Sequence, residues 1–395
     1  MRRRILLVTA VAPAADGRSG GARAVHGIAS ELVRRHDVVL LHLGGGEVDA
    51  AIAERCVAVH DVTPPDPGPW GVRARGAAGI LRGRSLKAGA SAVAVLRRRV
   101  AELAGGFSPQ IVQVESGVLG DALAGAGAAR RVVTVYEPAA SLGECLALRR
   151  DGLPFAHRLD AWTALREERR MLGLADAVVV LSERDRRLLA PAAGGRTELV
   201  TIPLGWDVPP AACDPAGSDP PTLLFVGNFV HPPNIDAATT LAARILPLVR
   251  GQHPDARLQI VGASPPAQLR ALASDAIEVT GEVASVMPYL ERAAVVVVPI
   301  ALGGGMRVKV LEALAAGKAV VASTRAAEGV GARPGRDLLV VDGDRQTAAA
   351  VGGLLADAGA RRAMATAARA WALRELRWAS MADRYDELYA RLGRR

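Results

Sequence analysis

The chain has 395 residues, of which 50% are hydrophobic and 23% are charged, which suits two packed domains of roughly 150–200 residues and excludes a disordered chain. Aromatic residues make up only 3%, which argues against an RNA-binding module that stacks bases on aromatic side chains. The formal net charge of +9 is carried mostly by dispersed arginines, so charge alone is a weak argument for DNA binding, and we expect no nucleic-acid partner.

Apolar, β-branched runs alternate with helical patterns through the first half of the chain. The first run follows three arginines, but it is too short for a signal peptide and predicts a buried strand at Arg4–Ala10. The apolar spacing of Ala22–Arg35 is typical of a helix. Ser182 is predicted to cap a short charged helix. Further strands are predicted at Val38–Leu43, Ile111–Val114, Arg131–Tyr136, Ala177–Leu181 and Val200–Pro203.

A proline-rich stretch at Asp207–Pro221 has the composition of a linker, and the same alternation then restarts. Strands are predicted at Thr222–Gly227, Arg257–Gly262, Ala293–Pro299 and Ala319–Ser323, and helices at Ile235–Arg250 and Arg307–Ala316. The final stretch, Arg361–Leu392, is helical and charged. Continuously apolar strands are typical of parallel sheets covered by helices on both faces. The fold class is therefore α/β, with two Rossmann-like domains at residues 1–206 and 222–378 joined by a linker at 207–221.

A glycine turn follows the buried strand Ala293–Pro299. Gly303, Gly304 and Gly305 come directly before a helix that opens near Met306. Glycines let a ligand approach the backbone closely, and a helix N-terminus presents free N–H groups with a partial positive charge. Because ligands bind at the carboxyl ends of such strands, this turn is a candidate anion site.

Two cations and one carboxylate follow on the first turns of that helix. Arg307 and Lys309 add positive charge that suits a diphosphate, and Glu312, one turn later, is placed to accept hydrogen bonds from a ribose diol. The alternative is an ordinary glycine turn whose helix turns these side chains toward solvent. The spacing matches neither a P-loop nor the Gly-x-Gly-x-x-Gly dinucleotide motif.

The stretch Pro299–Thr324 resembles retaining glycosyltransferases of family 4, which have the GT-B fold, and the resemblance extends over nearly the whole chain. Other matching segments are Gly20-Gly21, Ala175–Ser182, Ile202–Asp207, Leu224–Asn228, Leu258–Gly262 and Val279–Gly281. These motifs together are specific for the family and are not specific for a donor or an acceptor.

The resemblance implies transfer of a sugar from a nucleotide-diphosphate donor to a small-molecule, glycan or lipid-linked acceptor. The donor belongs to the C-terminal domain and the acceptor to the N-terminal domain across a cleft, and a final helix at 379–395 crosses back to the N-terminal domain. The nucleotide sugar is a co-substrate, with no further cofactor and no metal. The implied donor-binding residues are Gly20, Gly21, Gly227, Asn228, Asn234, Gly281, Gly304, Gly305, Met306, Arg307, Val308, Lys309 and Glu312.

Two departures from the family concern the donor site. The first of the family's paired glutamates, which faces the donor sugar, falls on Gly304, so that carboxylate is absent. The family's Arg and Lys after the first strand of the C-terminal domain fall on Asn228 and Asn234. We expect the diphosphate charge to be met from Arg307 and Lys309 instead.

A third departure concerns catalysis. The family's His-Asp pair, whose histidine faces the reacting sugar, is replaced by Tyr136 and Glu137. These two are the candidate catalytic residues, although a phenol does not share a proton as readily as an imidazole. Glu137 is alternatively a turn residue before Pro138. In retaining enzymes of this fold no protein nucleophile is well placed, so transfer without the histidine is expected.

A run of basic residues between Arg73 and Arg99 lacks acidic neighbours and suits an anionic membrane surface or acceptor; the alternative is a solvated helix face. The three cysteines and seven histidines show no metal spacing and no disulfide framework. We expect a cytoplasmic protein with possible peripheral contact at the inner membrane face. A sugar-nucleotide epimerase, a phosphorylase, or an inactive nucleotide-binding partner of another transferase remain alternatives.

Overall fold

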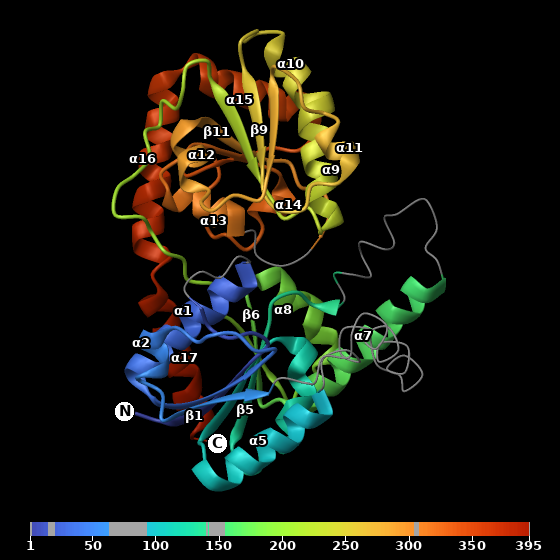
Figure 1. The fold of residues 1–395 in the computed structure, drawn as a ribbon, viewed down its shortest axis with the longest axis vertical. Coiled ribbons are helices and arrows are strands. Elements are labelled where there is room, and N and C mark those ends of the chain that lie inside the picture. The colour runs from blue at the N-terminus through green and yellow to red at the C-terminus, as the bar shows by residue number, and fades with distance from the viewer. Residues whose placement is uncertain are drawn as a thin grey trace. The chain divides into compact units, whose positions relative to one another are not determined.

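The computed structural model describes residues 2–14, 20–62, 93–139, 141, 155–303 and 308–394. The chain divides into two compact units (Figure 1). Unit 1 comprises Met1–Gly205 together with Trp378–Arg395, and unit 2 comprises Trp206–Arg377.

Unit 1 is built on a seven-stranded parallel sheet in the order β3-β2-β1-β4-β5-β6-β7. Its strands are β1 (Arg4–Thr9), β2 (Asp37–Leu43), β3 (Ala58–Val62), β4 (Ile111–Glu115), β5 (Arg130–Val135), β6 (Ala177–Val180) and β7 (Glu198–Thr201). The order reverses direction between β1 and β4. In open α/β sheets, ligands bind outside the carboxyl ends of the strands at such a reversal.

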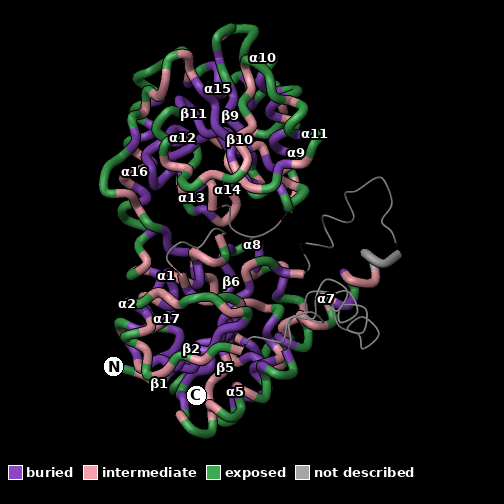
Figure 2. The backbone as a smooth tube through the Cα atoms, in the orientation of Figure 1, coloured by how far each residue is buried: buried purple, intermediate pink, exposed green. Residues whose placement is uncertain are grey.

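Helices cover both faces of this sheet. They are α1 (Gly20–Arg35), α2 (Ala50–Ala53), α5 (Val93–Phe107), α7 (Phe155–Leu174), α8 (Glu183–Leu189) and α17 (Trp378–Leu392), with 3₁₀ segments η1 (Gly117–Gly125) and η2 (Ala190–Ala192). One apolar core joins the sheet to α1 and α17, and the other joins it to α5, η1 and α7. The buried strands follow from their continuous apolar sequences (Figure 2).

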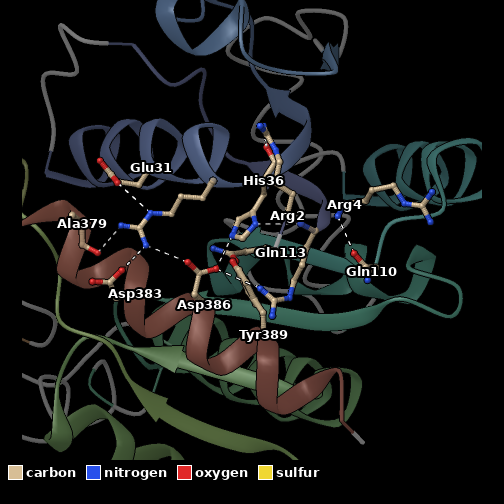
Figure 3. Close-up of polar contacts among 12 residues, drawn as sticks. Arg2, Arg4, Glu31, His36, Gln110, Gln113, Ala379, Asp383, Asp386 and Tyr389 are labelled. Carbon is tan, nitrogen blue, oxygen red and sulfur yellow. Dashed lines mark hydrogen bonds and ion pairs between the residues drawn. The ribbon is translucent and has the colours of Figure 1, made fainter.

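The C-terminal helix α17 belongs to unit 1 and is held there by polar as well as apolar contacts. His36 Nε2 lies 2.9 Å from Asp386 Oδ1, and Arg35 NH1 lies 3.2 Å from Asp386 Oδ2 (Figure 3). The hydroxyl of Tyr389 donates to the Gln113 side chain on β4. These contacts join residues far apart in the sequence, so α17 completes this unit.

Unit 2 contains a six-stranded parallel sheet in the order β10-β9-β8-β11-β12-β13. Its strands are β8 (Thr222–Val226), β9 (Arg257–Val261), β10 (Ile277–Gly281), β11 (Ala293–Val298), β12 (Val320–Ala322) and β13 (Leu339–Val340). Its helices are α9 (Pro232–Thr240), a π-helical turn η3 (Leu241–Ile245), α10 (Leu246–Arg250), α11 (Ala267–Arg270), α12 (Met287–Arg292), α13 (Val308–Ala315), α14 (Thr324–Ala327), α15 (Asp344–Ala356) and α16 (Ala358–Glu375). Here the order reverses between β8 and β11.

The predicted strands are present, and both longer helical stretches predicted in the second half of the chain are helical, each in more than one segment. The helix expected over Ile235–Arg250 is interrupted by the π-helical turn η3, because Pro247 lacks the N–H that would continue the α-helical ladder. The helical stretch expected over Arg361–Leu392 comprises the two helices α16 and α17, and α17 covers most of the range of the final helix expected at 379–395. They are separated at Leu376, which is buried and whose carbonyl accepts from the Trp206 N–H at 2.7 Å.

Two strand boundaries were misplaced. The strand expected at Val200–Pro203 is β7, Glu198–Thr201, which ends before Pro203 because proline has no N–H to donate to a ladder. Tyr136 lies just after β5 and not in it. The strand β3 was not predicted, because its residues alternate between partial exposure and exposure and carry no apolar run.

Candidate functional site

Glycines line the carboxyl edge of the unit 2 sheet. Gly227 follows β8, Gly262 follows β9, Gly281 ends β10, and Gly303 lies beyond β11. Gly262 has a φ of 141°, and a Cβ there would lie 1.8 Å from the Gly227 carbonyl oxygen. Gly281 and Gly303 also have positive φ, of 79° and 101°. A side chain at Gly262 would overlap the Gly227 carbonyl, so only glycine fits there. At these glycine positions the edge presents backbone groups and no side chains.

Lys309 of α13 reaches the first turn of α9 and the ring of Phe225 on β8. Its Nζ donates to Asn234 Oδ1 at 2.6 Å and lies 4.7 Å from the centroid of the Phe225 ring. Asn234 Nδ2 in turn donates to the Asn228 carbonyl at 2.7 Å. Three residues predicted as donor-binding therefore lie together: Lys309 of α13, Asn234 in the first turn of α9, and Asn228 in the loop after β8.

Phe225 was not predicted as part of this site. It is fully buried on β8 and presents its ring to the lysine ammonium, an arrangement that favours a cation electrostatically. Its only sequence signal was its position on the strand next to the reversal of strand order, in a chain with four phenylalanines.

Two helices begin at this edge. α9 opens at Pro232 after β8, and α13 opens at Val308 after β11. Since β8 and β11 are neighbours, both N-termini lie at the reversal of strand order, where their partial positive charges favour an anion. Glu312 is half-buried on α13 one turn beyond Lys309, on the same side of the helix.

Gly304, Gly305, Met306 and Arg307 lie outside the described residues, as does most of the basic run. In unit 1, Gly20 and Gly21 open α1 beyond the carboxyl end of β1, as the resemblance implies.

Tyr136 and Glu137 follow the carboxyl end of β5 in unit 1. The Tyr136 hydroxyl donates to Glu115 Oε2 at 2.8 Å, while Glu137 is exposed. Burial, and then the negative charge of Glu115, hold the pKa of Tyr136 well above its ordinary range. The phenol is therefore not a proton acceptor near neutral pH, and a catalytic role for this pair stays a prediction. Glu115, the buried last residue of β4, was not predicted.

No described helix is long and apolar enough to cross a membrane. Within the described ranges, no three or more His, Cys, Asp or Glu side chains are grouped so that they could hold a metal ion.

Two family models match the chain, one in each unit. Residues 19–205 match the glycosyl transferase 4-like domain, and residues 220–357 match the glycosyl transferases group 1. A GDP-mannose-dependent alpha-(1-6)-phosphatidylinositol monomannoside mannosyltransferase of Mycolicibacterium smegmatis is 32% identical over 261 residues. That match covers 60% of this chain and 66% of the relative, just under two thirds of its length.

Solved structures share the fold. Sucrose-phosphate synthase from Thermosynechococcus elongatus superposes with a TM-score of 0.76 at 19% identity, covering 99% of each chain. Anabaena HepE in complex with UDP and glucose gives a TM-score of 0.67 at 13% identity, covering 98% of this chain and 100% of that one. The two matched domains, the relative and the shared architecture place this chain among the family 4 glycosyltransferases of the GT-B fold.

Proposed function

We propose that this glycosyltransferase transfers a sugar from a nucleotide-diphosphate donor to an acceptor hydroxyl, with retention of the anomeric configuration. The donor binds at the carboxyl edge of β8 and β11 in unit 2. The observation that carries the proposal is the contact of Lys309 with Asn234 and Phe225. It brings a cation from α13 to Asn234, one of the two positions at which the family resemblance implies a basic residue.

The charge needed by the diphosphate is supplied by the helix side of the site. Lys309 and the N-termini of α9 and α13 give positive potential at one edge, and Arg307 is the second proposed cation. In this mechanism the leaving diphosphate takes the acceptor proton, and the protein stabilises the developing negative charge. Donor binding by these residues needs no metal, and the nucleotide sugar is the only co-substrate.

The ribose and sugar contacts follow from the same helix. Glu312, one turn beyond Lys309, accepts from the ribose diol in this proposal. Gly304 takes the position of the family's sugar-facing glutamate. Recognition of the donor sugar therefore rests on other groups.

The acceptor belongs to unit 1 in this proposal. A small molecule, a glycan or a lipid carrier fits a role in natural-product or cell-surface glycoconjugate synthesis. Peripheral contact with the inner membrane face is tested with liposomes. Binding that does not depend on anionic lipid content would remove the electrostatic part of that idea.

A thermal-shift screen of GDP-mannose, UDP-glucose, ADP-glucose and dTDP-glucose tests donor binding, because a ligand that binds the folded chain raises its stability. GDP-mannose is the first donor to test because the mycobacterial relative is named for it. Release of nucleoside diphosphate and NMR of the anomeric product then test transfer and retention.

The binding screen and the product measurements also distinguish a transferase from an epimerase and from an inactive nucleotide-binding partner. Conversion of the donor sugar without any acceptor would indicate an epimerase. Tight binding of a nucleotide sugar without hydrolysis or transfer would indicate an inactive partner. No thermal shift with any of the four compounds would contradict the proposed donor site.

A further inference from the structure

Three of the chain's four tyrosines belong to one polar group in unit 1, which is buried except at the partly exposed Tyr136. The group lies inside the sheet face covered by α17 and centres on Glu115. Its members are Gln113 and Glu115 of β4, Thr134 at the end of β5 with Tyr136 beyond it, and Tyr385 and Tyr389 of α17.

The hydrogen bonds of this group run toward one carboxylate. Glu115 Oε1 accepts from Gln113 Nε2 at 2.5 Å and from Thr134 Oγ1 at 2.9 Å, and Oε2 accepts from Tyr136 at 2.8 Å. Because Thr134 gives its proton to Glu115, Tyr385 must be the donor in its 3.0 Å contact with Thr134. Tyr389 donates to the Gln113 carbonyl oxygen.

The carboxyl group of Glu115 is costly to bury. Glu115 is only 1% exposed, and the side chains that donate hydrogen bonds to it among the described residues are neutral. Burial raises the pKa of Glu115, while the three donors act in the opposite sense. A glutamine would fill the same volume, but its amide would present a donor to Tyr136 in place of an acceptor oxygen. Packing alone therefore does not explain a carboxyl group here.

The backbone beside Glu115 is also unusual. Ser116 has a φ of 144°, a region that is costly for any residue other than glycine and that persists only where the surroundings impose it. A Cβ on the next residue, Gly117, would lie 3.3 Å from the Val135 side chain. The ends of β4 and β5 are thus held closely together at the edge where ligands bind in such sheets.

We propose that Glu115 is a positioning residue of this transferase, which holds the partly exposed Tyr136 ring in one orientation at the ligand-binding edge of unit 1. The inference rests on the proposed function, because only in a glycosyltransferase of this family does Tyr136 take the position of the histidine that faces the reacting sugar. The remainder of the group joins Glu115 to α17 through Gln113 and Thr134, and we assign that part to the stability of unit 1.

Kinetics of four variants test the role. Glu115→Gln and Tyr136→Phe should each lower kcat for turnover of GDP-mannose, or of UDP-glucose if the screen selects it, by roughly ten- to hundredfold. KM for the nucleotide sugar should stay unchanged. The double variant should be no slower than the slower single variant, because both changes break one interaction. Tyr389→Phe, the matched control at the α17 end, should lower the melting temperature with little loss of turnover.

The proposal would be overturned if the loss of kcat in the double variant equalled the product of the two single losses. It would also be overturned if Tyr389→Phe lowered kcat as much as Glu115→Gln, because the group would then be purely structural.

A second measurement needs no turnover and separates the two proposals. Nitration by tetranitromethane, read by mass spectrometry, should be severalfold faster at Tyr136 in Glu115→Gln than in the wild type, with Tyr289 of unit 2 as the internal reference. Unchanged nitration of Tyr136 would refute positioning by Glu115. Absence of nucleotide-sugar binding in the wild type, with faster nitration in the variant, would refute only the proposed function.

Discussion

Replacement of Lys309 by methionine tests the donor site most directly. Methionine keeps the length and the apolar part of the side chain and removes the ammonium, which now contacts Asn234 at 2.6 Å and the Phe225 ring at 4.7 Å. A hydrogen bond between a charged donor and a phosphate contributes about 1.5–3 kcal/mol. The expected loss of affinity for GDP or UDP is therefore roughly 10- to 150-fold.

Isothermal titration calorimetry with the nucleoside diphosphate measures this loss. The wild-type affinity should fall as salt is raised, because exposed charge interactions are screened, and the variant should depend less on salt. The side chain is only partly buried, so the free energy of unfolding should change by less than about 1 kcal/mol. Urea denaturation checks that the variant is folded.

Arg257→Met is the matched control. Arg257 is exposed and begins β9, so it lies at the opposite edge of the same parallel sheet. Its replacement removes one positive charge from unit 2 and should leave the affinity unchanged. Equal weakening by both variants would mean that only the net charge of the unit matters, and unchanged affinity in Lys309→Met would refute the donor site.

Three further predictions concern stability, each measured by urea denaturation. Gly262→Ala should lower the free energy of unfolding by more than about 3 kcal/mol, because its Cβ would lie 1.8 Å from the Gly227 carbonyl oxygen. The control Gly353→Ala, at an open helical position, should leave the free energy of unfolding unchanged or raise it. Similar effects of the two substitutions would contradict the clash. Ser116→Gly should gain about 1 kcal/mol by relieving its φ of 144°, and a loss would disprove the strain. Burial lowers the pKa of His36 below its ordinary 6.5, so the unfolded chain binds the proton more readily. The free energy of unfolding of the wild type should then decrease as pH falls through about 6.5, whereas that of His36→Gln should not show this decrease. A stability difference between the two proteins that does not change with pH would contradict this prediction.

Much of the architecture was predictable because its signals are local. The continuous apolar runs at Leu224 and Val295 indicated buried parallel strands, which the structure confirms. The serine at Ser182 indicated a helix start, and its side chain accepts from the Asp185 N–H at 3.1 Å. The edge strand at Ala58–Val62 was missed because it is not buried on both faces.

The candidate site was predicted in part for the same reason. Glycine spacing and the charged residues Lys309 and Glu312 of α13 are visible in a short segment, so both could be selected from the sequence. Glu115 could not, since a single carboxylate at the end of an apolar strand does not reveal what it faces. An acidic residue ending a central buried strand was the one available signal.

The sequence by itself determined the alternation of strands and helices, the two-domain α/β class, and the residue types of helix α13. Each depends on side-chain periodicity or turn chemistry within a few residues. Only the tertiary structure decided that Lys309 meets Asn234, 75 positions away, and that Tyr385 meets Thr134, 251 positions away. Those contacts depend on strand order and on where the last helix docks, because parallel strands joined by crossovers bring distant segments to one edge.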